Sequence, residues 1–166
     1  MRKLILVRHA KSGRKDPELD DHERPLNRRG ERDSITMSRF LMEQDEALDV
    51  VYSSTATRAL DFAQTLSEFC GYSLIPDLSF YTFSFDEFFE ILRSLPNAAG
   101  NIAIVGHNPA ITQAVNFLSG AEIANVPTAG IVALTCEINE WDELREGCAE
   151  LAYFESPKRL LNGHTI

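Results

Sequence analysis

Two histidines in this sequence stand directly after short apolar runs. Residues 4–7 (Leu-Ile-Leu-Val) lead into Arg8 and His9, and residues 102–105 (Ile-Ala-Ile-Val) lead through a glycine into His107. Such runs predict strands that are buried on both faces, and ligands of open α/β sheets bind beyond the carboxyl ends of these strands. A neutral imidazole is a good nucleophile toward phosphorus, because its unperturbed pKa of about 6.5 leaves a nitrogen lone pair free at pH 7. The pattern therefore indicates phosphoryl chemistry at one edge of a sheet.

A third junction adds a second arginine. The run at residues 50–52 (Val-Val-Tyr) is followed by a Ser-Ser-Thr cluster that supplies helix N-cap candidates, and helical apolar spacing then places Arg58 in the first turns of a helix. Helix N-termini attract anions, and a guanidinium offers a planar fork that suits phosphate oxygens. We expect His9 to attack the phosphorus atom while Arg8, Arg58 and His107 bind the phosphoryl oxygens.

Several short segments occur in an order that is characteristic of one protein family, and together they span nearly the whole chain. They are Leu6–Ser12, Arg24–Leu26, Arg29–Gly30, Ser53–Ser54 with Arg58, Val105–Pro109, Pro127–Gly130 and Pro157–Lys158. On these segments the chain resembles the histidine phosphatase superfamily, which contains phosphoglycerate mutases and their phosphatase relatives, and within it the small phosphohistidine phosphatases of the SixA type. The resemblance implies that His9 is the nucleophile and forms a phosphohistidine that water then hydrolyses.

The elements alternate between strand and helix, which predicts an α/β fold in a single domain over residues 1–166. We expect a three-layer, mostly parallel twisted sheet with helices on both faces, and the resemblance implies that it is phosphoglycerate mutase-like. The last two strands have no long helix between them, so an antiparallel edge strand is expected as well. Beyond the three runs above, the predicted strands are 74–75, 131–134 and 151–154. The predicted helices are 28–44, the helix that contains Arg58 and ends near residue 71, 85–92 and 111–118.

Composition narrows the class of partner. The 166 residues include 16 Lys and Arg against 25 Asp and Glu, a formal net charge of −9, which argues against a general binder of nucleic acid or of acidic membranes. No apolar stretch is long enough to span a membrane, and no cationic leader precedes the first strand. Cys70, Cys136 and Cys148 show no paired spacing, which is typical of reduced thiols in a cytoplasmic protein. Cys70 is expected on the buried side of its helix.

A general acid is harder to find. Ester phosphatases of the resembled family usually protonate the leaving alkoxide with a carboxylate from the segment that corresponds to residues 77–87. Here this segment is rich in aromatic residues, and Glu87 is expected to cap a helix together with Ser84. Asp21 and Asp20 in the first loop are candidate acids, although the same residues suit a solvated acidic loop. An imidazole leaving group needs less protonation than an alkoxide, so the missing acid favours phosphohistidine over an ester as the substrate.

Other polar residues near the motifs carry open alternatives. Lys11 can reach the phosphate or remain a solvated charge at the rim, and Arg24 can line the pocket mouth or pair with a loop acid. Asn108 is expected to cap the following helix rather than touch the substrate. His22 and His164 lack motif context and are expected at the surface. No spacing typical of a metal site is present, so we expect neither a metal nor another cofactor.

The sequence thus predicts a phosphatase that removes phosphate from a phosphorylated histidine of a protein, of the phosphotransfer-domain type, through a covalent intermediate. One alternative is a phosphatase for a small phosphate ester, which would place a carboxylate of Asp21, Asp77, Asp86 or Glu87 beside the leaving group. Another alternative is a non-catalytic phosphate-binding interaction module. The presence of a complete catalytic set argues against it: Arg8, His9, Arg58 and His107. A mutase is disfavoured because the short chain lacks insertions that would enclose a bisphosphate.

Overall fold

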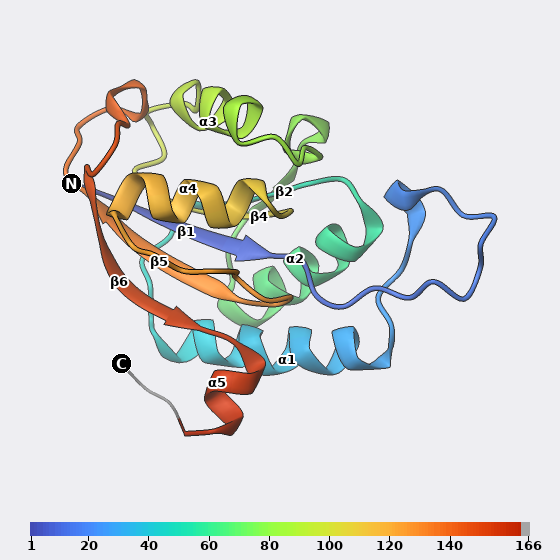
Figure 1. Cartoon of the computed structure of the whole chain (residues 1–166). Helices are drawn as coiled ribbons and strands as arrows, with labels where there is room; N and C mark the ends of the chain where they lie inside the picture. The colour runs from blue at the N-terminus through green and yellow to red at the C-terminus, as the bar shows by residue number, and fades with distance from the viewer. Residues whose placement is uncertain (164–166) are drawn as a thin grey trace.

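A mixed β-sheet forms the middle layer of the protein (Figure 1). The computed structural model describes residues 1–163. Within them the strand order is β3-β2-β4-β1-β5-β6. The strands are β1 (Arg2–Arg8), β2 (Val50–Ser53), β3 (Leu74–Pro76), β4 (Asn101–Gly106), β5 (Ile131–Cys136) and β6 (Ala149–Glu155). The first four run parallel, whereas β5 pairs antiparallel with both β1 and β6. The mostly parallel sheet and its antiparallel edge pairing are therefore confirmed, with β5 as the reversed strand and β6 outermost.

Helices cover both faces of this sheet, as predicted (Figure 1). The helices α1 and α2 pack on one face and α3 and α4 on the other, while the short α5 lies beside α1. Their bounds are α1 (Arg28–Glu43), α2 (Thr57–Cys70), α3 (Phe85–Arg93), α4 (Ala110–Ser119) and α5 (Pro157–Leu161), with single 3₁₀ turns η1 (Asp21–Glu23), η2 (Leu78–Phe80) and η3 (Trp141–Glu143). None of the helices in residues 1–163 is long and apolar enough to cross a membrane.

Strand β1 explains why two separate cores form. Its four apolar residues are fully buried, and their side chains alternate between the two faces of the sheet. Leu4 and Leu6 belong to the core under α3 and α4, whereas Ile5 and Val7 belong to the core under α1 and α2. A continuous apolar run is the expected sequence of a parallel strand that is covered on both sides.

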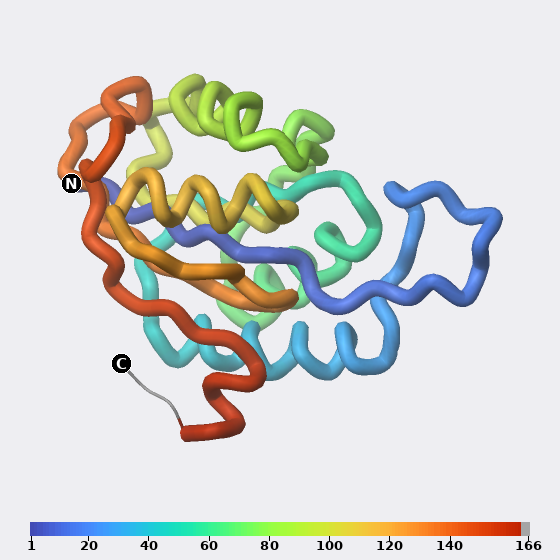
Figure 2. The backbone as a smooth tube through the Cα atoms, viewed as in Figure 1, coloured from blue at the N-terminus to red at the C-terminus, as the bar shows by residue number. Residues whose placement is uncertain are grey.

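The loop at residues 12–27 projects away from the carboxyl end of β1 before the chain enters α1 (Figure 2). Its two ends are held close together, because Asn27 donates its N–H to the Lys11 carbonyl at 3.0 Å and Ser12 forms an isolated bridge with Leu26. Gly30 in the first turn of α1 allows this approach, since a Cβ there would lie 2.1 Å from the Lys11 carbonyl oxygen. The arrangement anchors the loop next to the end of β1.

Two capping predictions require correction. The N-cap of α2 is Ala56 and not a residue of the Ser-Ser-Thr cluster, although the Ser54 hydroxyl accepts the Ala56 N–H at 3.1 Å. At α3 the Ser84 hydroxyl accepts the Glu87 N–H at 3.3 Å, as a capping box requires, but the Glu87 carboxylate accepts the Thr82 hydroxyl at 2.6 Å. The Ser84 N–H, which a full capping box would pair with Glu87, is instead donated to the Thr82 hydroxyl at 3.2 Å, so a side chain two residues away replaces the Glu87 carboxylate.

Candidate active site

The candidate catalytic residues meet because three neighbouring parallel strands end at one edge of the sheet. Strand β4 lies between β1 and β2, and its register aligns Gly106 with Arg8. The residues that follow these strand ends therefore face one another across a short distance. The rings of His9 and His107 have their centroids 5.2 Å apart. The predicted convergence of the strand ends is thus present in the structure.

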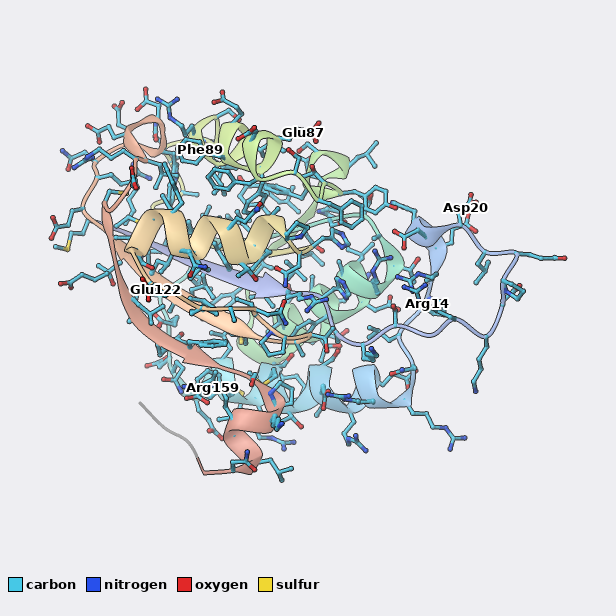
Figure 3. All side chains as sticks on the ribbon, in the orientation of Figure 1. Arg14, Asp20, Glu87, Phe89, Glu122 and Arg159 are labelled. Carbon is cyan, nitrogen blue, oxygen red and sulfur yellow. The ribbon has the colours of Figure 1, made fainter. Side chains whose placement is uncertain are left out.

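A polar pocket of about 290 Å³ opens at this edge. Its lining is strongly basic, and Asp21 is the single acidic residue among the described residues that line it. Figure 3 labels Arg14 on the loop that borders this pocket. The basic residues of the lining are Arg8, Lys11, Arg14, Arg24 and Arg58. A concentration of positive charge in an acidic chain favours an anionic ligand at this point.

His9 is oriented as a nucleophile. Its ring is 9% exposed, and Nδ1 lies 2.8 Å from the Ala10 carbonyl oxygen, which can only accept a hydrogen bond. Nδ1 therefore carries the proton, and the lone pair is on Nε2. Burial lowers the pKa of His9 to about 4, and the positive charges of Arg58, Arg8 and Arg24 act in the same direction against the opposing hydrogen bond to Ala10. The imidazole is consequently neutral and nucleophilic at pH 7.

His107 is oriented as a hydrogen-bond donor. Its ring is almost fully buried, and Nε2 lies 2.8 Å from the Ser54 hydroxyl. Either tautomer satisfies this contact, because a hydroxyl both donates and accepts; in the one with Nδ1 protonated, the Ser54 hydroxyl donates to Nε2 and Nδ1 offers an N–H. Burial lowers the pKa of His107 to about 3, with smaller contributions from His9 and Arg58. The Nδ1 atom is buried and has no hydrogen-bond partner among the described residues.

Arg8 and Arg58 each have one buried N–H donor without a hydrogen-bond partner in residues 1–163. Arg8 donates Nη1 to the Val126 carbonyl at 3.0 Å, and the almost fully buried Arg58 donates Nη1 to the Asp21 carbonyl at 2.6 Å. In both side chains the Nε atom is buried without a partner in residues 1–163. Burial lowers the pKa of Arg8, and so does the positive charge of Arg58 nearby. A buried polar atom without a hydrogen-bond partner lowers the stability of the fold. Three such atoms, on Arg8, Arg58 and His107, therefore indicate a site for the oxygens of an anion.

Asp21 holds several of these groups in place. Its carboxylate accepts hydrogen bonds from Arg58 Nη2 at 2.9 Å and from the Tyr81 hydroxyl at 2.7 Å, and it pairs with Arg24 at 3.0 Å. Burial acts to raise the pKa of Asp21, but the hydrogen bonds from Tyr81 and Arg58 and the charges of Arg58 and Arg24 outweigh it and lower the pKa to about 2. A carboxylate that stays ionised at neutral pH has no proton to give, so this geometry opposes the candidate-acid role.

The other predicted acids do not line the pocket. Asp77 caps the η2 turn by accepting the Ser79 N–H at 2.9 Å, and Glu87 is engaged with Thr82. Asp86 lines a separate surface hollow beside α4, and exposed Asp20 precedes η1 without a capping hydrogen bond. Among the described residues, no carboxylate other than Asp21 lines the pocket of His9.

The remaining sequence candidates are placed as follows. Lys11 is exposed at the pocket wall, while Arg24 both lines the pocket and pairs with Asp21. Asn108 precedes the N-cap Pro109 and is not itself the cap, although its side chain accepts the Thr112 N–H at 3.1 Å in the first turn of α4; it also lines the pocket. His22 was expected at the surface but is half-buried, with Nε2 2.8 Å from the Thr55 hydroxyl. His164 lies outside the described residues.

Three residues in or beside the pocket lack a signal in the sequence. Phe83 lines the pocket with 43% of its surface exposed, and its ring centroid lies 5.1 Å from that of His107. Tyr81 packs edge-on against the same imidazole at 5.4 Å, and Thr128 reaches the pocket from the turn before β5. Loop residues of this kind follow no periodicity, so only the fold brings them to the site. Within residues 1–163, no three His, Cys, Asp or Glu side chains are grouped so that they could hold a metal ion.

Comparison with protein families gives a match over the first half of the chain. The model of the histidine phosphatase superfamily (branch 1) matches residues 4–88, which include His9 and Arg58. The chain belongs to the histidine phosphatase superfamily and is a phosphatase. Two curated relatives are each 30% identical to this histidine phosphatase. One is an uncharacterized chloroplastic protein of Arabidopsis thaliana (86% of this chain, 70% of the relative), and the other an uncharacterized protein of Mycobacterium tuberculosis (92% and 100%).

Solved structures share the same fold. A SixA protein of Agrobacterium tumefaciens matches this histidine phosphatase with a TM-score of 0.80 at 21% identity, covering 94% of this chain and 98% of the other. The protein histidine phosphatase SixA in complex with tungstate matches with a TM-score of 0.78 at 20% identity (95% and 99%). A mycobacterial glucosyl-3-phosphoglycerate phosphatase matches with a TM-score of 0.66 at 12% identity (94% and 100%). The expected phosphoglycerate mutase-like, SixA-type architecture is confirmed.

Proposed function

We propose that this phosphatase hydrolyses phosphohistidine on a cytoplasmic protein of the phosphotransfer-domain type, through a covalent phosphohistidine on His9. The observation that carries the proposal is the composition of the pocket: a neutral nucleophile and unpaired donors, but no carboxylate that could hold a proton for a poor leaving group.

In the first step, Nε2 of His9 attacks the phosphorus atom in line with the bond that breaks. The P–Nε2 bond forms as the P–N bond to the substrate imidazole is cleaved, and Nδ1–H remains hydrogen-bonded to the Ala10 carbonyl, 2.8 Å away. That carbonyl stabilises the positive charge that the His9 ring acquires. The free Nε atoms of Arg8 and Arg58 and Nδ1–H of His107 bind the equatorial phosphoryl oxygens, on which negative charge is concentrated.

In the second step, water attacks the phosphorus atom of phosphorylated His9. The P–O bond forms as P–Nε2 is cleaved, inorganic phosphate leaves, and Nε2 regains its lone pair. Because burial holds the pKa of His9 at about 4, its imidazole departs as a neutral ring without a separate acid. The same donors serve both steps, since both pass through a similar phosphoryl group in the same place.

The leaving group decides between the candidate substrates. An imidazole whose second nitrogen is protonated leaves as a neutral molecule, because its free pKa is about 6.5, whereas an alkoxide must be protonated as it departs. Asp21 cannot supply that proton while its pKa is about 2. The partly exposed ring of Phe83 also offers an apolar surface beside the pocket against which a second imidazole can pack. Both features favour phosphohistidine over an alkyl ester.

The test is a leaving-group series with the full-length protein. We expect turnover of a phosphorylated histidine phosphotransfer domain and of aryl phosphates, a steep decrease in rate as the pKa of the leaving group rises, and very slow hydrolysis of alkyl phosphates. Rapid quench with labelled substrate is expected to trap acid-labile, base-stable phosphate on His9. The matched variant His9→Ala is expected to lose the label and to lose turnover by roughly a thousandfold or more.

Other outcomes would assign a different function. A flat series with efficient alkyl-phosphate hydrolysis and no action on the phosphorylated domain would make this a small-ester phosphatase. Binding of tungstate or vanadate without turnover of any substrate would make it a phosphate-binding interaction module. Appreciable turnover by His9→Ala would exclude the covalent mechanism.

A further inference from the structure

The catalytic pocket continues into a groove along the protein surface. Thr128 lines both the catalytic pocket and a second hollow of about 310 Å³. Arg29, Pro157 and Lys158 line both this second hollow and a third one of about 680 Å³ between α1 and α5. We call the second and third hollows together the basic groove. It leads from the phosphoryl site across the turn before β5 to the side of α1.

The basic groove is lined by cations and apolar residues. Its cations are Arg29, Arg32, Lys158 and Arg159, and the acidic residue among the described lining is Asp33, which is buried and 3.4 Å from Arg29 Nε. Figure 3 labels Arg159 beside α5; its guanidinium lies 4.7 Å above the Phe154 ring and donates Nε to the Phe154 carbonyl.

These contacts hold one cation at the wall of the groove, while the Arg29 side chain is 59% exposed. The apolar side chains of Leu160, Leu161 and Pro157 line the groove next to these charges. A ligand that fits has negative groups and apolar groups side by side.

The charge of the groove is opposite to that of most of the chain. Residues 61–156, which include β3 to β6, contain 14 acidic and 2 basic residues, although the whole protein has a net charge of −9. Positive charge is therefore segregated to α1, α5 and the surroundings of the catalytic pocket. Segregation of this kind creates a local positive field that attracts acidic ligands despite the overall negative charge.

We propose that the basic groove binds an acidic, partly apolar segment of the phosphohistidine-bearing substrate protein and thereby presents its phosphohistidine to His9; this proposal rests on the proposed function. A protein segment fits better than a second phosphate, because the groove is long and carries apolar side chains between its charges. A nucleic acid fits poorly, because the acidic remainder of the chain repels a polyanion that extends beyond the groove.

The experiment compares two phosphohistidine peptides that differ in the flanking residues. One peptide carries four glutamates and two leucines within ten residues of the phosphohistidine, and the other carries glutamines in place of the glutamates. Steady-state kinetics at low salt is expected to give a kcat/KM about three- to tenfold higher for the glutamate peptide, mainly through KM, and the preference is expected to decrease as salt is added.

Charge-reversal variants test whether the preference for the glutamate peptide arises in the basic groove. The double variant Arg29→Glu, Lys158→Glu is expected to abolish the preference and leave kcat for phosphoramidate, which has no flanking residues, unchanged. The matched control Arg39→Glu, Arg145→Glu changes the charge by the same amount at exposed residues that do not line the groove, and is expected to keep the preference. Equal rates for the two peptides with the wild-type protein, or an equal loss of preference in both double variants, would overturn the proposal.

If the proposed function is wrong, the result differs from the one expected if only the groove proposal is wrong. It would appear as wild-type hydrolysis of small esters without action on either peptide. In that case fluorescence anisotropy with the unphosphorylated glutamate peptide decides the proposal on the same variants. Binding that is weakened only by Arg29→Glu, Lys158→Glu supports the groove, and binding that is equal for all three proteins or absent from all of them refutes it.

Discussion

The imidazole rings of His9 and His107 lie with their centroids 5.2 Å apart and their planes tilted by 49°, and both rings are neutral at pH 7. The proposed mechanism nevertheless gives these two neutral histidines different tasks, because their hydrogen bonds suit different tautomers. The Ala10 carbonyl leaves His9 with a free lone pair on Nε2, whereas a Ser54 hydroxyl that donates to Nε2 of His107 leaves a free N–H on Nδ1 of that ring. In the proposed mechanism one ring attacks phosphorus and the other binds an oxygen.

The pH dependence of this pair is the first prediction. Because their pKa values are lowered to about 4 and about 3, neither ring is expected to gain a proton between pH 8 and pH 5. Protonation removes the lone pair of His9, so kcat/KM is expected to fall only as the pH decreases through about 4. Titration of the ring carbon and nitrogen signals by NMR, assigned with His9→Asn and His107→Asn, measures this directly. A midpoint near 6.5 for either ring would contradict the prediction.

The same pKa values predict how stability changes with pH. Between pH 6.5 and 4 the unfolded chain binds more protons at His9 and His107 than the folded chain does, so the free energy of unfolding is expected to decrease as the pH is lowered through this range. Asp21 contributes in a lower range, because its pKa is lowered to about 2 and its stabilisation is lost only as the pH falls below the ordinary value of 3.8. Urea unfolding at pH 7, 6 and 5 checks the prediction. The variant His9→Asn, His107→Asn is expected to lose less stability than the wild type over this range.

Ser54 is predicted to act as a positioning residue for His107. Ser54→Ala removes the hydroxyl that fixes the tautomer of His107, so kcat is expected to fall about tenfold, the free-energy equivalent of one buried hydrogen bond, with little change in KM. Ser53→Ala is a matched control, because Ser53 is also fully buried but donates its hydroxyl to the Ser54 carbonyl and not to a catalytic ring. Equal losses of kcat in the two variants would show that the role of Ser54 is only structural.

The sequence was sufficient to predict the sheet, and the closeness of its candidate site residues, for one physical reason. Buried parallel strands have continuous apolar sequences, and their carboxyl ends lie at the same edge of the sheet. Arg8, His9 and His107 follow such sequences, so local sequence patterns alone place them together. Arg58 follows from the helical spacing after β2.

The loops could not be placed in the same way. The pairing of Asp21 with Arg58 joins residues 37 positions apart, and the contact of Tyr81 with Asp21 spans 60 positions. No periodicity encodes such contacts, so the ionised state of Asp21 and the aromatic wall formed by Tyr81 and Phe83 emerge only from the three-dimensional structure.

Gly30 separates the effect of helix propensity from that of sterics. Alanine is favoured over glycine inside a helix by about 1 kcal/mol, so propensity alone predicts that Gly30→Ala stabilises the protein. A Cβ at this position, however, would lie 2.1 Å from the Lys11 carbonyl oxygen. We expect a net destabilisation of about 1–3 kcal/mol, because overpacking against backbone displaces α1 or the loop after His9. Chemical denaturation measures it.

Gly13→Ala is the matched control for this change. A Cβ at Gly13, in the loop that precedes α1, meets only the Asn27 Cβ at 3.8 Å. Gly13→Ala is therefore expected to unfold at the same denaturant concentration as the wild type. A Gly30→Ala protein as stable as the wild type would show that the junction between Lys11 and α1 relaxes at little cost.

Phe83 is predicted to select substrates whose leaving group is a ring. Its side chain lines the pocket with 43% of its surface exposed, and its inner edge packs on His107, so the exposed part is free to contact the departing imidazole or phenol. Aromatic pairs contribute about 0.5–1.5 kcal/mol beyond the burial of their area, which corresponds to about a two- to tenfold change in kcat/KM. Phe83→Ala is expected to lower kcat/KM by this factor for phosphohistidine peptide and aryl phosphate, but not for phosphoramidate, whose leaving group is ammonia.

Two variants serve as controls. Phe83→Tyr is expected to restore kcat/KM for the two ring substrates. Leu78→Ala changes a 65% exposed residue of the preceding turn that does not line the pocket, and it is expected to leave kcat/KM unchanged for all three substrates. Because Phe83 also touches His107, a disturbed catalytic ring would slow phosphoramidate as much as the ring substrates, and that uniform loss would show that Phe83 supports the histidine and does not contact the leaving group.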